Sequence, residues 1–268
     1  MTVSTAELAA RELANLIGGW RASLGLHPEA RIDRDGSVVW FTSAIDLPFV
    51  NGIIIDGPDV APGIVERVVD ELRARGRPFV ARVRVGMDDA VADELARLGM
   101  RDARGETLPA MALHPIEAPD PPAVPGGLVI RRVADQAGLD DHYTIVVEGF
   151  GLPLEFARGV MPVEALAHEA LYVGYVDGEP VATALTYTGD ATVGVYNVAT
   201  REAWRRRGYG AAVTRHAILD AAAAGATVAI LQSSAAGRGV YESLGFREVM
   251  QYRILVDAAG EALDSTSG

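Results

Sequence analysis

Alternating apolar and polar positions indicate the strands in the C-terminal half of the chain. The pattern predicts strands at 128–133, 171–176, 181–188, 192–200, 227–232 and 246–255. Asp177-Gly178 and Gly189-Asp190 are residue pairs typical of hairpin turns, so 171–200 is expected to form a three-strand antiparallel meander. Helical spacing predicts helices at 134–148, 209–224 and 235–244, the last ending at Gly245. The order is strand, one or two helices, three strands, helix, strand, helix, strand.

The N-terminal half opens with an amphipathic helix. Ser4 and Glu7 have the spacing of a capping box, and one face carries Leu13, Leu16, Ile17, Trp20 and Leu24. Beyond it, the pattern predicts strands at 37–43, 51–55, 78–85 and 108–113, with helices at 61–75 and 88–98. Both halves therefore mix helices and strands, which is typical of an α/β protein of the α+β type.

A proline-rich segment separates the two halves. Residues 115–127, PIEAPDPPAVPGG, hold five prolines and end in two glycines. Proline removes backbone donors and favours extended chain, so this segment is expected to be an interdomain linker. The predicted domains are 1–114 and 128–257, followed by a flexible tail at 258–268.

The two halves share a local pattern that suggests a tandem repeat. Leu98-Gly99-Met100-Arg101 aligns with Leu244-Gly245-Phe246-Arg247 at an offset of 146, and Gly76 aligns with Gly225 at an offset of 149. One three-residue insertion or deletion would relate the two offsets. The alternative is coincidence, because helix–glycine–strand junctions are common in α/β proteins.

Residues 201–213, REAWRRRGYGAAV, concentrate positive charge between a predicted strand and a predicted helix. The start of a helix offers unpaired N–H groups and a dipole that favours anions. Gly208 and Gly210 allow close approach to the backbone, and Arg205, Arg206 and Arg207 supply guanidinium groups suited to phosphate. No P-loop or complete dinucleotide fingerprint is present. The pattern predicts a pyrophosphate cradle, and the alternative is a solvated arginine loop.

This stretch resembles the Q/R-x-x-G-x-G/A signature of the GNAT N-acetyltransferases. The segments AAVTRHAILDAAAAGATVAILQSS and GRGVYESLGF resemble the parts of the family that follow the signature, and the resemblance covers about 128–256. It implies a mixed, mostly antiparallel central sheet flanked by helices. With the repeat, it implies two GNAT-like units, of which the first is degenerate.

The resemblance also assigns roles to individual residues, with acetyl-CoA as co-substrate. The expected acetyl-CoA contacts are Val198, Ala199, Thr200, Arg205, Arg206, Arg207, Gly208, Tyr209, Gly210, Ala211 and Ser234, where Ser234 replaces the usual asparagine. Tyr241 matches the family tyrosine and is expected to protonate the departing thiolate as general acid. Glu148 is the preferred general base, with Glu155, Tyr196 and Asn197 as other polar residues near the expected cleft. Gly237 stands where alanine is usual.

The first half lacks the chemistry expected of the second. Its counterpart of the arginine loop, 56–66, contains acids and no arginine, and the counterpart of Tyr241 is Leu95. We therefore expect it to bind no acetyl-CoA and to shape the acceptor site or serve a structural role.

Composition restricts the remaining possibilities. The 268 residues carry a formal net charge of −12 and no cysteine, which excludes disulfides and a cysteine nucleophile and argues against nucleic acid as a partner. With no signal peptide, membrane span or metal-ligand spacing in the sequence, we expect a cytoplasmic monomer or homodimer without a metal. The expected reaction is direct acetyl transfer to a primary amine of a small molecule or peptide. The alternatives are a non-catalytic acyl-CoA sensor and a related acyl or aminoacyl transferase.

Overall fold

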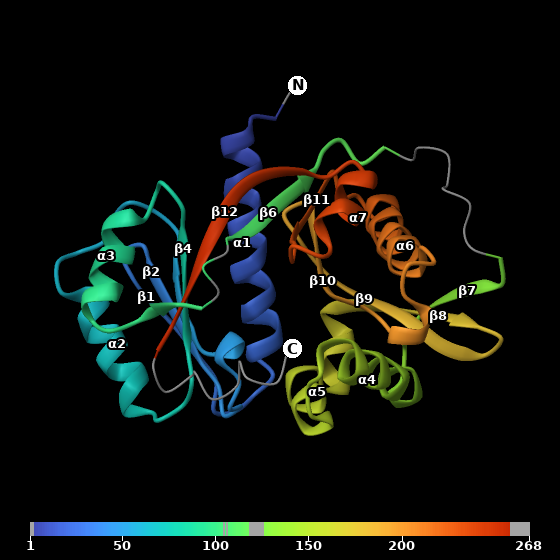
Figure 1. The fold of residues 1–268 in the computed structure, drawn as a ribbon, viewed down its shortest axis with the longest axis horizontal. Helices are drawn as coiled ribbons and strands as arrows, with labels where there is room; N and C mark the ends of the chain where they lie inside the picture. The colour runs from blue at the N-terminus through green and yellow to red at the C-terminus, as the bar shows by residue number, and fades with distance from the viewer. Residues whose placement is uncertain (1–2, 104, 106, 118–125, 258–268) are drawn as a thin grey trace. The chain divides into compact units, whose positions relative to one another are not determined.

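The computed structural model describes residues 3–103, 105, 107–117 and 126–257, and backbone contacts divide the chain into two compact units (Figure 1). The larger unit combines Met1–Ser23 with Ala110–Val249, and the smaller combines Leu24–Pro109 with Met250–Gly268. This division differs from the predicted domains, because the first helix joins the larger unit and the final strand joins the smaller one. The predicted tail, 258–268, and most of the predicted linker lie outside the described residues.

The larger unit is built on a sheet with the strand order β6-β11-β10-β9-β8-β7. Its strands are β6 (Leu108–Leu113), β7 (Leu128–Arg132), β8 (Glu169–Val176), β9 (Glu179–Gly189), β10 (Thr192–Thr200) and β11 (Val228–Gln232). Every neighbouring pair is antiparallel except β10 and β11, which run parallel. The mixed, mostly antiparallel sheet expected from the sequence is confirmed.

Two tight turns connect the predicted meander. Asp177 and Gly178 have φ of 51° and 84°, as a type I′ hairpin turn requires. The second turn is centred one residue later than predicted, on Asp190 and Ala191, with φ of 49° and 55°. Gly189 instead ends β9 and pairs with Thr192.

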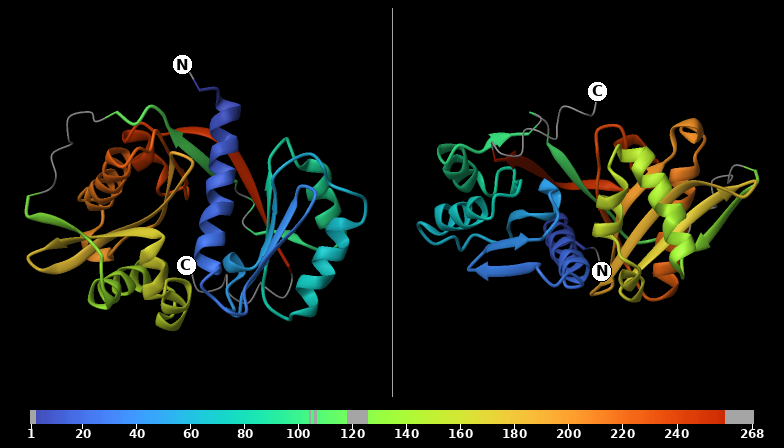
Figure 2. Two further views of the ribbon diagram at one scale, coloured as in Figure 1. Left: turned by 180° about the vertical axis from the view of Figure 1, so that it is seen from behind. Right: turned by 90° about the horizontal axis from the view of Figure 1, so that it is seen from below.

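Helices cover both faces of this sheet (Figure 2). The helices are α1 (Thr5–Leu24), α4 (Gln136–Phe150), α5 (Leu154–Val160), α6 (Tyr209–Ala223) and α7 (Arg238–Ser243). On one face, His142 of α4 is hydrogen-bonded to the Thr183 hydroxyl at 2.9 Å. On the same face, Gly18 of α1 packs closely against the Tyr187 ring, so that a Cβ at this position would lie 3.0 Å from it. On the opposite face, Val213 of α6 packs with apolar side chains such as Val193. The sheet therefore separates α1 and α4 from α6.

The strands of the smaller unit have the order β1-β2-β3-β4-β12, with β5 paired with β12. Its strands are β1 (Arg31–Asp35), β2 (Val38–Thr42), β3 (Gly52–Ile55), β4 (Val80–Arg84), β5 (Arg101–Asp102) and β12 (Arg247–Val256), of which β12 starts in the larger unit. Helices α2 (Ile64–Ala74) and α3 (Asp89–Arg97) pack on it through an apolar core that includes Ile53, Val68, Leu95 and Leu255.

The final strand of each sequence half pairs within the unit built mainly from the other half. β6 precedes the proline-rich segment, yet it pairs with β11 through Ala110–Leu113. β12 ends the second half, yet its residues Tyr252–Val256 pair with β4. The two halves therefore exchange strands, which the predicted domain boundaries did not anticipate.

A strand–helix–strand arrangement occurs once in each unit. β3 and β4 run parallel on either side of α2 along the chain, just as β10 and β11 do on either side of α6. In both, the residue before the helix is a glycine in the left-handed region, Gly63 with φ of 78° and Gly208 with φ of 81°. This likeness is what the predicted repeat requires.

Candidate functional site

β10 and β11 separate along their length. They pair only through Thr192–Gly194 and Val228–Ile230, whereas β10 continues to Thr200. A bulge between Tyr196 and Ala199, with Asn197 at φ of 49°, also shifts the pairing of β10 with β9. Three of the residues predicted to contact acetyl-CoA, Val198, Ala199 and Thr200, lie on this stretch. Their edge of the sheet has no described strand partner on the β11 side.

The loop after β10 leads directly into the amino end of α6. Gly208 is the N-cap, and the first bonded amide of the helix is that of Ala212, which donates to the Gly208 carbonyl at 3.0 Å. The amides of 208–211, which include Tyr209, Gly210 and Ala211, have no acceptor among the described residues. A Cβ at Gly210 would lie 2.9 Å from the Thr200 hydroxyl, so glycine keeps the helix start close to β10. The arrangement offers several N–H groups to an anion.

The three arginines of the loop are exposed and differ in their contacts. Arg205 donates to the carbonyls of Thr200 (3.2 Å) and Gly149 (3.4 Å). The Arg207 guanidinium lies 5.1 Å from the ring centre of Trp204. Arg206, with φ of 60°, has no hydrogen bond or ion pair with the described residues. Arg205 therefore supports the loop, whereas Arg206 is available to a ligand.

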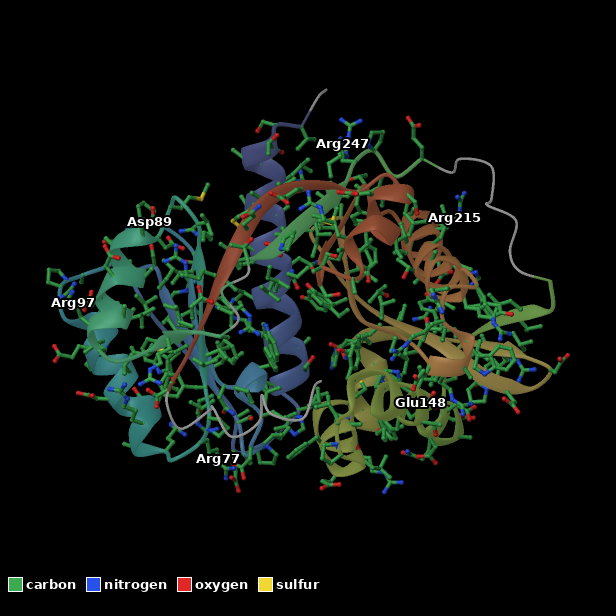
Figure 3. All side chains as sticks on the ribbon, viewed as in Figure 1. Arg77, Asp89, Arg97, Glu148, Arg215 and Arg247 are labelled. Carbon is green, nitrogen blue, oxygen red and sulfur yellow. The ribbon has the colours of Figure 1, made fainter. Side chains whose placement is uncertain are left out.

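Glu148 lies near the end of α4 and contacts the start of the same loop (Figure 3). Its Oε2 accepts a hydrogen bond from Arg201 Nε at 2.7 Å, and its Oε1 accepts one from the Glu202 amide at 2.8 Å. The bond from Arg201 is the main reason why the pKa of Glu148 is lowered. These contacts join α4 to the loop, and a lowered pKa makes a carboxylate a weaker base.

Tyr241 lies on α7, on the α6 side of the sheet. Its ring packs edge-on against Phe246, with ring centres 6.1 Å apart, and belongs to the apolar cluster beneath α6. Burial raises the pKa of the phenol to about 12, so it keeps its proton at neutral pH. Ser234 is exposed, and its hydroxyl accepts a bond from the Gly237 amide at 3.2 Å. A Cβ at Gly237 would lie 3.1 Å from the Tyr241 ring, so glycine there gives the ring room.

A buried polar cluster on the other face went unpredicted. Glu12 and Asn15 of α1 are 0% and 4% exposed. Asn15 Nδ2 donates to the Thr192 carbonyl at 2.8 Å, and Asn15 Oδ1 accepts from the Tyr196 hydroxyl at 2.7 Å. Glu12 accepts a bond from the Gln232 amide group. The sequence signal that could have revealed this cluster is the pair Glu12 and Asn15, which are three positions apart and stand next to the apolar positions of the first helix.

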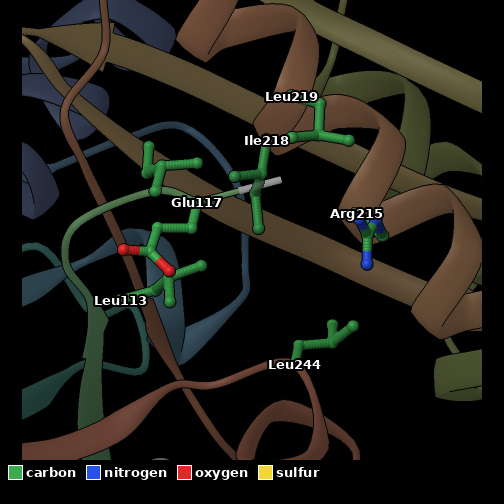
Figure 4. A pocket seen from close by; sticks show the side chains of 7 residues that line it. Leu113, Glu117, Arg215, Ile218, Leu219 and Leu244 are labelled. Carbon is green, nitrogen blue, oxygen red and sulfur yellow. The ribbon is translucent and has the colours of Figure 1, made fainter. Parts of the chain in front are cut away.

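A shallow apolar pocket lies elsewhere on the larger unit (Figure 4). Leu113, Ile218 and Leu244 line it, with Glu117 and Arg215 at its edge. The lining residues that belong to α6, Arg215, Ile218 and Leu219, lie on its later turns, whereas the open amides are at its first turn. The pocket is therefore separate from the loop.

Known proteins with a similar sequence or fold include acetyltransferases. A family sequence model described as "Acetyltransferase (GNAT) domain" matches residues 167–248, which run from β8 into β12 and include the arginine loop and Tyr241. A solved structure of a GCN5-related N-acetyltransferase from Kribbella flavida has 25% sequence identity and a TM-score of 0.72, covering 96% of this chain and 98% of that one. The chain carries a GNAT acetyltransferase domain at residues 167–248. It is therefore an acyltransferase, as the loop signature predicted.

Two further GNAT structures share the fold across almost the whole chain. One is a GCN5-related N-acetyltransferase from Sphaerobacter thermophilus, with 17% identity, a TM-score of 0.63 and coverage of 96% of this chain and 94% of that one. The other is a tandem GNAT protein from the clavulanic acid biosynthesis pathway, with 14% identity, a TM-score of 0.64 and coverage of 96% and 95%. No curated protein matches the chain by sequence.

The described residues contain neither a candidate metal site nor a candidate membrane-spanning helix. No group of three or more histidine, aspartate or glutamate side chains there is arranged to hold a metal ion. Across the same ranges, every helix is too short or too polar to cross a membrane.

Proposed function

We propose that this GNAT enzyme transfers the acetyl group of acetyl-CoA directly to a primary amine. The observation that carries the proposal is the set of open amides at 208–211, next to a β10 edge that has separated from β11. The amides and Arg206 fit a diphosphate, and the open edge of β10 fits the extended amide-containing arm of the same molecule. The bound co-substrate supplies an activated acyl group as a thioester.

The side chains around the gap suggest how transfer proceeds. We assign Tyr241 as the general acid that protonates the departing sulfur, since its phenol remains protonated at neutral pH. Val198 lies on the stretch of β10 beyond its pairing with β11, and we propose that a backbone N–H near it stabilises the oxyanion of the tetrahedral intermediate. Direct attack accords with a chain that has no cysteine, and the net charge of −12 would attract a cationic amine.

For Glu148, the contacts support a different role from the predicted one. Both oxygens accept hydrogen bonds from the loop start, and the pKa is lowered. We propose that Glu148 positions the arginine loop, and that the base lies elsewhere.

We further propose that the smaller unit is a degenerate GNAT-like repeat that binds no acetyl-CoA. The residue before α2 is a glycine with the same φ as Gly208 to within a few degrees, but no arginine follows the β3 strand before it. Leu95, the counterpart of Tyr241, is fully buried in the apolar core. The loop itself carries Asp56 and Asp59, and the nearby Arg34 is already engaged in an ion pair with Asp56.

Acetyl-CoA binding is the first test. At 100 times Kd, saturation should stabilise the fold by about 2.7 kcal/mol, which a thermal shift detects. Arg206→Glu reverses a charge that has no described partner and should weaken binding at least tenfold, roughly 1.4 kcal/mol. Gly210→Glu should abolish it, and Gly126→Glu, at an exposed site with open space around it, is the charge-matched control. Equal affinity in Gly210→Glu and Gly126→Glu, or wild-type affinity in Arg206→Glu, would contradict the cradle.

Turnover is the second test. Thiol release is followed with a panel of primary amines and a panel of acyl-CoAs, which separates an acetyltransferase from an enzyme for other acyl groups. Tyr241→Phe should lower kcat by about 10²–10⁴-fold while the Kd of acetyl-CoA stays the same. Tight binding without thiol release from any amine would identify an acyl-CoA sensor instead.

A further inference from the structure

Helix α1 places a buried carboxylate on the face of the sheet opposite Tyr241. Side chains alternate along a strand, so Val193 and Val195, which pack under α6, put Gly194 and Tyr196 on the α1 face. On β11, Ala229 and Leu231 pack under α6 in the same way, which puts Gln232 on the α1 face. Tyr196 and Gln232 therefore occupy the same face of the two strands, beyond the point where their pairing ends.

Glu12 contacts the end of β11. Its carboxylate accepts a hydrogen bond from Gln232, the last residue of β11. After burial, the charge of Glu12 also raises the pKa of Tyr196 on β10, together with the charge of Glu169. One turn further along α1, Asn15 holds both the Tyr196 hydroxyl and the Thr192 carbonyl. Glu12 is thus fully buried and bonded to the β11 side of the gap, one helical turn from Asn15, which is bonded to β10.

The two faces of the gap are chemically different. The α6 face carries the open amides, the arginines and Tyr241, which are the groups suited to the co-substrate. The α1 face carries Glu12, Tyr196 and Gln232. A thioester lying along the open edge of β10 can be approached by a second substrate from the α1 face, because the first face is filled by the co-substrate itself.

We propose that Glu12 is the general base of acetyl transfer and that the α1 face of the gap receives the acceptor as a cationic primary amine. This proposal rests on the proposed function. The buried carboxylate attracts the ammonium group and then takes one of its protons. Bulk water is excluded from the side chain, which strengthens both effects.

The protons and electrons of the transfer balance as follows. The ammonium gives one proton to Glu12, which releases it to solvent after the products have left, and the freed lone pair of nitrogen attacks the thioester carbonyl carbon. The C=O electron pair moves to oxygen and returns as the C–S bond breaks, with its pair leaving on sulfur. Sulfur takes the Tyr241 proton, and the second proton lost from nitrogen restores the phenol. The products are the amide, the free thiol and one proton.

Other carboxylates near the sheet are less suitable. Both oxygens of Glu148 are engaged by the loop. Glu169 of β8 is also buried on the α1 face, and its Oε1 accepts a bond from the Ser23 hydroxyl at 2.6 Å. It lies opposite Tyr187 of β9, which in turn lies opposite Gly194. Glu169 is therefore on a strand two removed from β10. Its charge also raises the pKa of Tyr196, but Glu12 is the one that is hydrogen-bonded to Gln232 at the end of β11.

Comparing Glu12→Gln with Glu7→Gln tests the proposal. Glu7 is on the same helix but exposed, and it pairs with Arg11. Glu12→Gln should lower kcat/KM for the best amine by about 100-fold or more, with the Kd of acetyl-CoA and the melting temperature close to those of Glu7→Gln. Glu12→Asp keeps the carboxylate and should recover part of the rate. It also serves as the test variant if Glu12→Gln does not fold.

A nucleophile that reacts without a base distinguishes a catalytic role of Glu12 from a structural one. Methoxyamine is neutral at neutral pH, so with uncatalysed thiol release subtracted, Glu12→Gln should transfer acetyl to it at nearly the wild-type rate. An equal loss for both amines, or wild-type activity in Glu12→Gln, would overturn the assignment and leave the proposed function standing. If the wild-type enzyme acetylates no amine, the proposed function fails and this assignment fails with it.

Discussion

Asn15 should be the most sensitive polar residue of α1. It donates to the Thr192 carbonyl at 2.8 Å and more weakly to the Tyr187 carbonyl at 3.4 Å, and it accepts from the Tyr196 hydroxyl at 2.7 Å. Asn15→Ala leaves the Tyr196 hydroxyl and the Thr192 carbonyl buried without this partner. At about 1–3 kcal/mol for each of these two groups, the free energy of unfolding should fall by roughly 2–6 kcal/mol.

Part of this loss belongs to the bond between Asn15 and Tyr196, and a double-mutant cycle isolates it. Tyr196→Phe alone should cost about 1–2 kcal/mol, since it leaves Asn15 Oδ1 without its donor. The double variant should be less destabilised than the sum of the single variants by about 1 kcal/mol or more, because each single change breaks the same bond. Arg21→Ala, at an exposed position of the same helix, should stay within about 0.5 kcal/mol of wild type.

Urea unfolding, followed by the fluorescence of Trp20 on α1 and of Trp204, measures all four proteins. The melting temperature of Asn15→Ala should fall by roughly 4–24 °C, at about 2–4 °C per kcal/mol for a chain of this size. Strict additivity of the two single changes, or an Asn15→Ala protein as stable as Arg21→Ala, would refute the reasoning. Either result would mean that α1 is not held on β10 by this residue.

Three further predictions concern the larger unit. Burial lowers the pKa of His142 from 6.5 to about 4, so acidification from about pH 6.5 to pH 4 protonates the unfolded chain first and should lower stability by roughly 3 kcal/mol at about 1.4 kcal/mol per pH unit. Urea midpoints across that range should fall less in His142→Gln, and an equal fall in both proteins would contradict the assignment. Glu148→Gln should weaken acetyl-CoA binding by about fivefold, roughly 1 kcal/mol, with kcat at saturation unchanged, and a collapse of kcat would restore the role of base. Residues 128–257 expressed alone lack α1 and β6, so they should give no cooperative thermal melt, and a soluble fragment that melts cooperatively would show that the exchanged strand is dispensable.

Local patterns predicted most of the elements well. The strand at 192–200 and the start of the helix at Tyr209 agree with β10 and α6 to the residue, because alternation and the glycine turn are both written in the local sequence. β1 was missed, since its sequence RIDRD carries charges on an exposed edge where alternation is not needed. The predicted helix at 235–244 begins only at Arg238, because the Ser234 hydroxyl caps a turn before it.

Partners that are distant in sequence could not be predicted in the same way. Alternation shows that 108–113 and 246–255 are strands, but it does not say which strand each one pairs with. The exchange of β6 and β12 between the units therefore had no local signal. For Glu148, the sequence placed the residue near the loop, whereas the bond from Arg201 that lowers its pKa depends on a contact 53 residues away.

The buried polar residues of α1 explain why the first half of the sequence, which has no catalytic signature of its own, remains joined to the second half, which has one. A surface helix needs polar residues only on its exposed face, so Glu12 and Asn15 would be misplaced if α1 served the first half alone. Both instead meet β10 and β11, the two strands whose separation creates the gap. With β6 also pairing with β11, the first half of the sequence supports this sheet from one face and from one edge. A half that has no arginine loop of its own can still be required in this way, because the sheet of the larger unit depends on its helix and its strand.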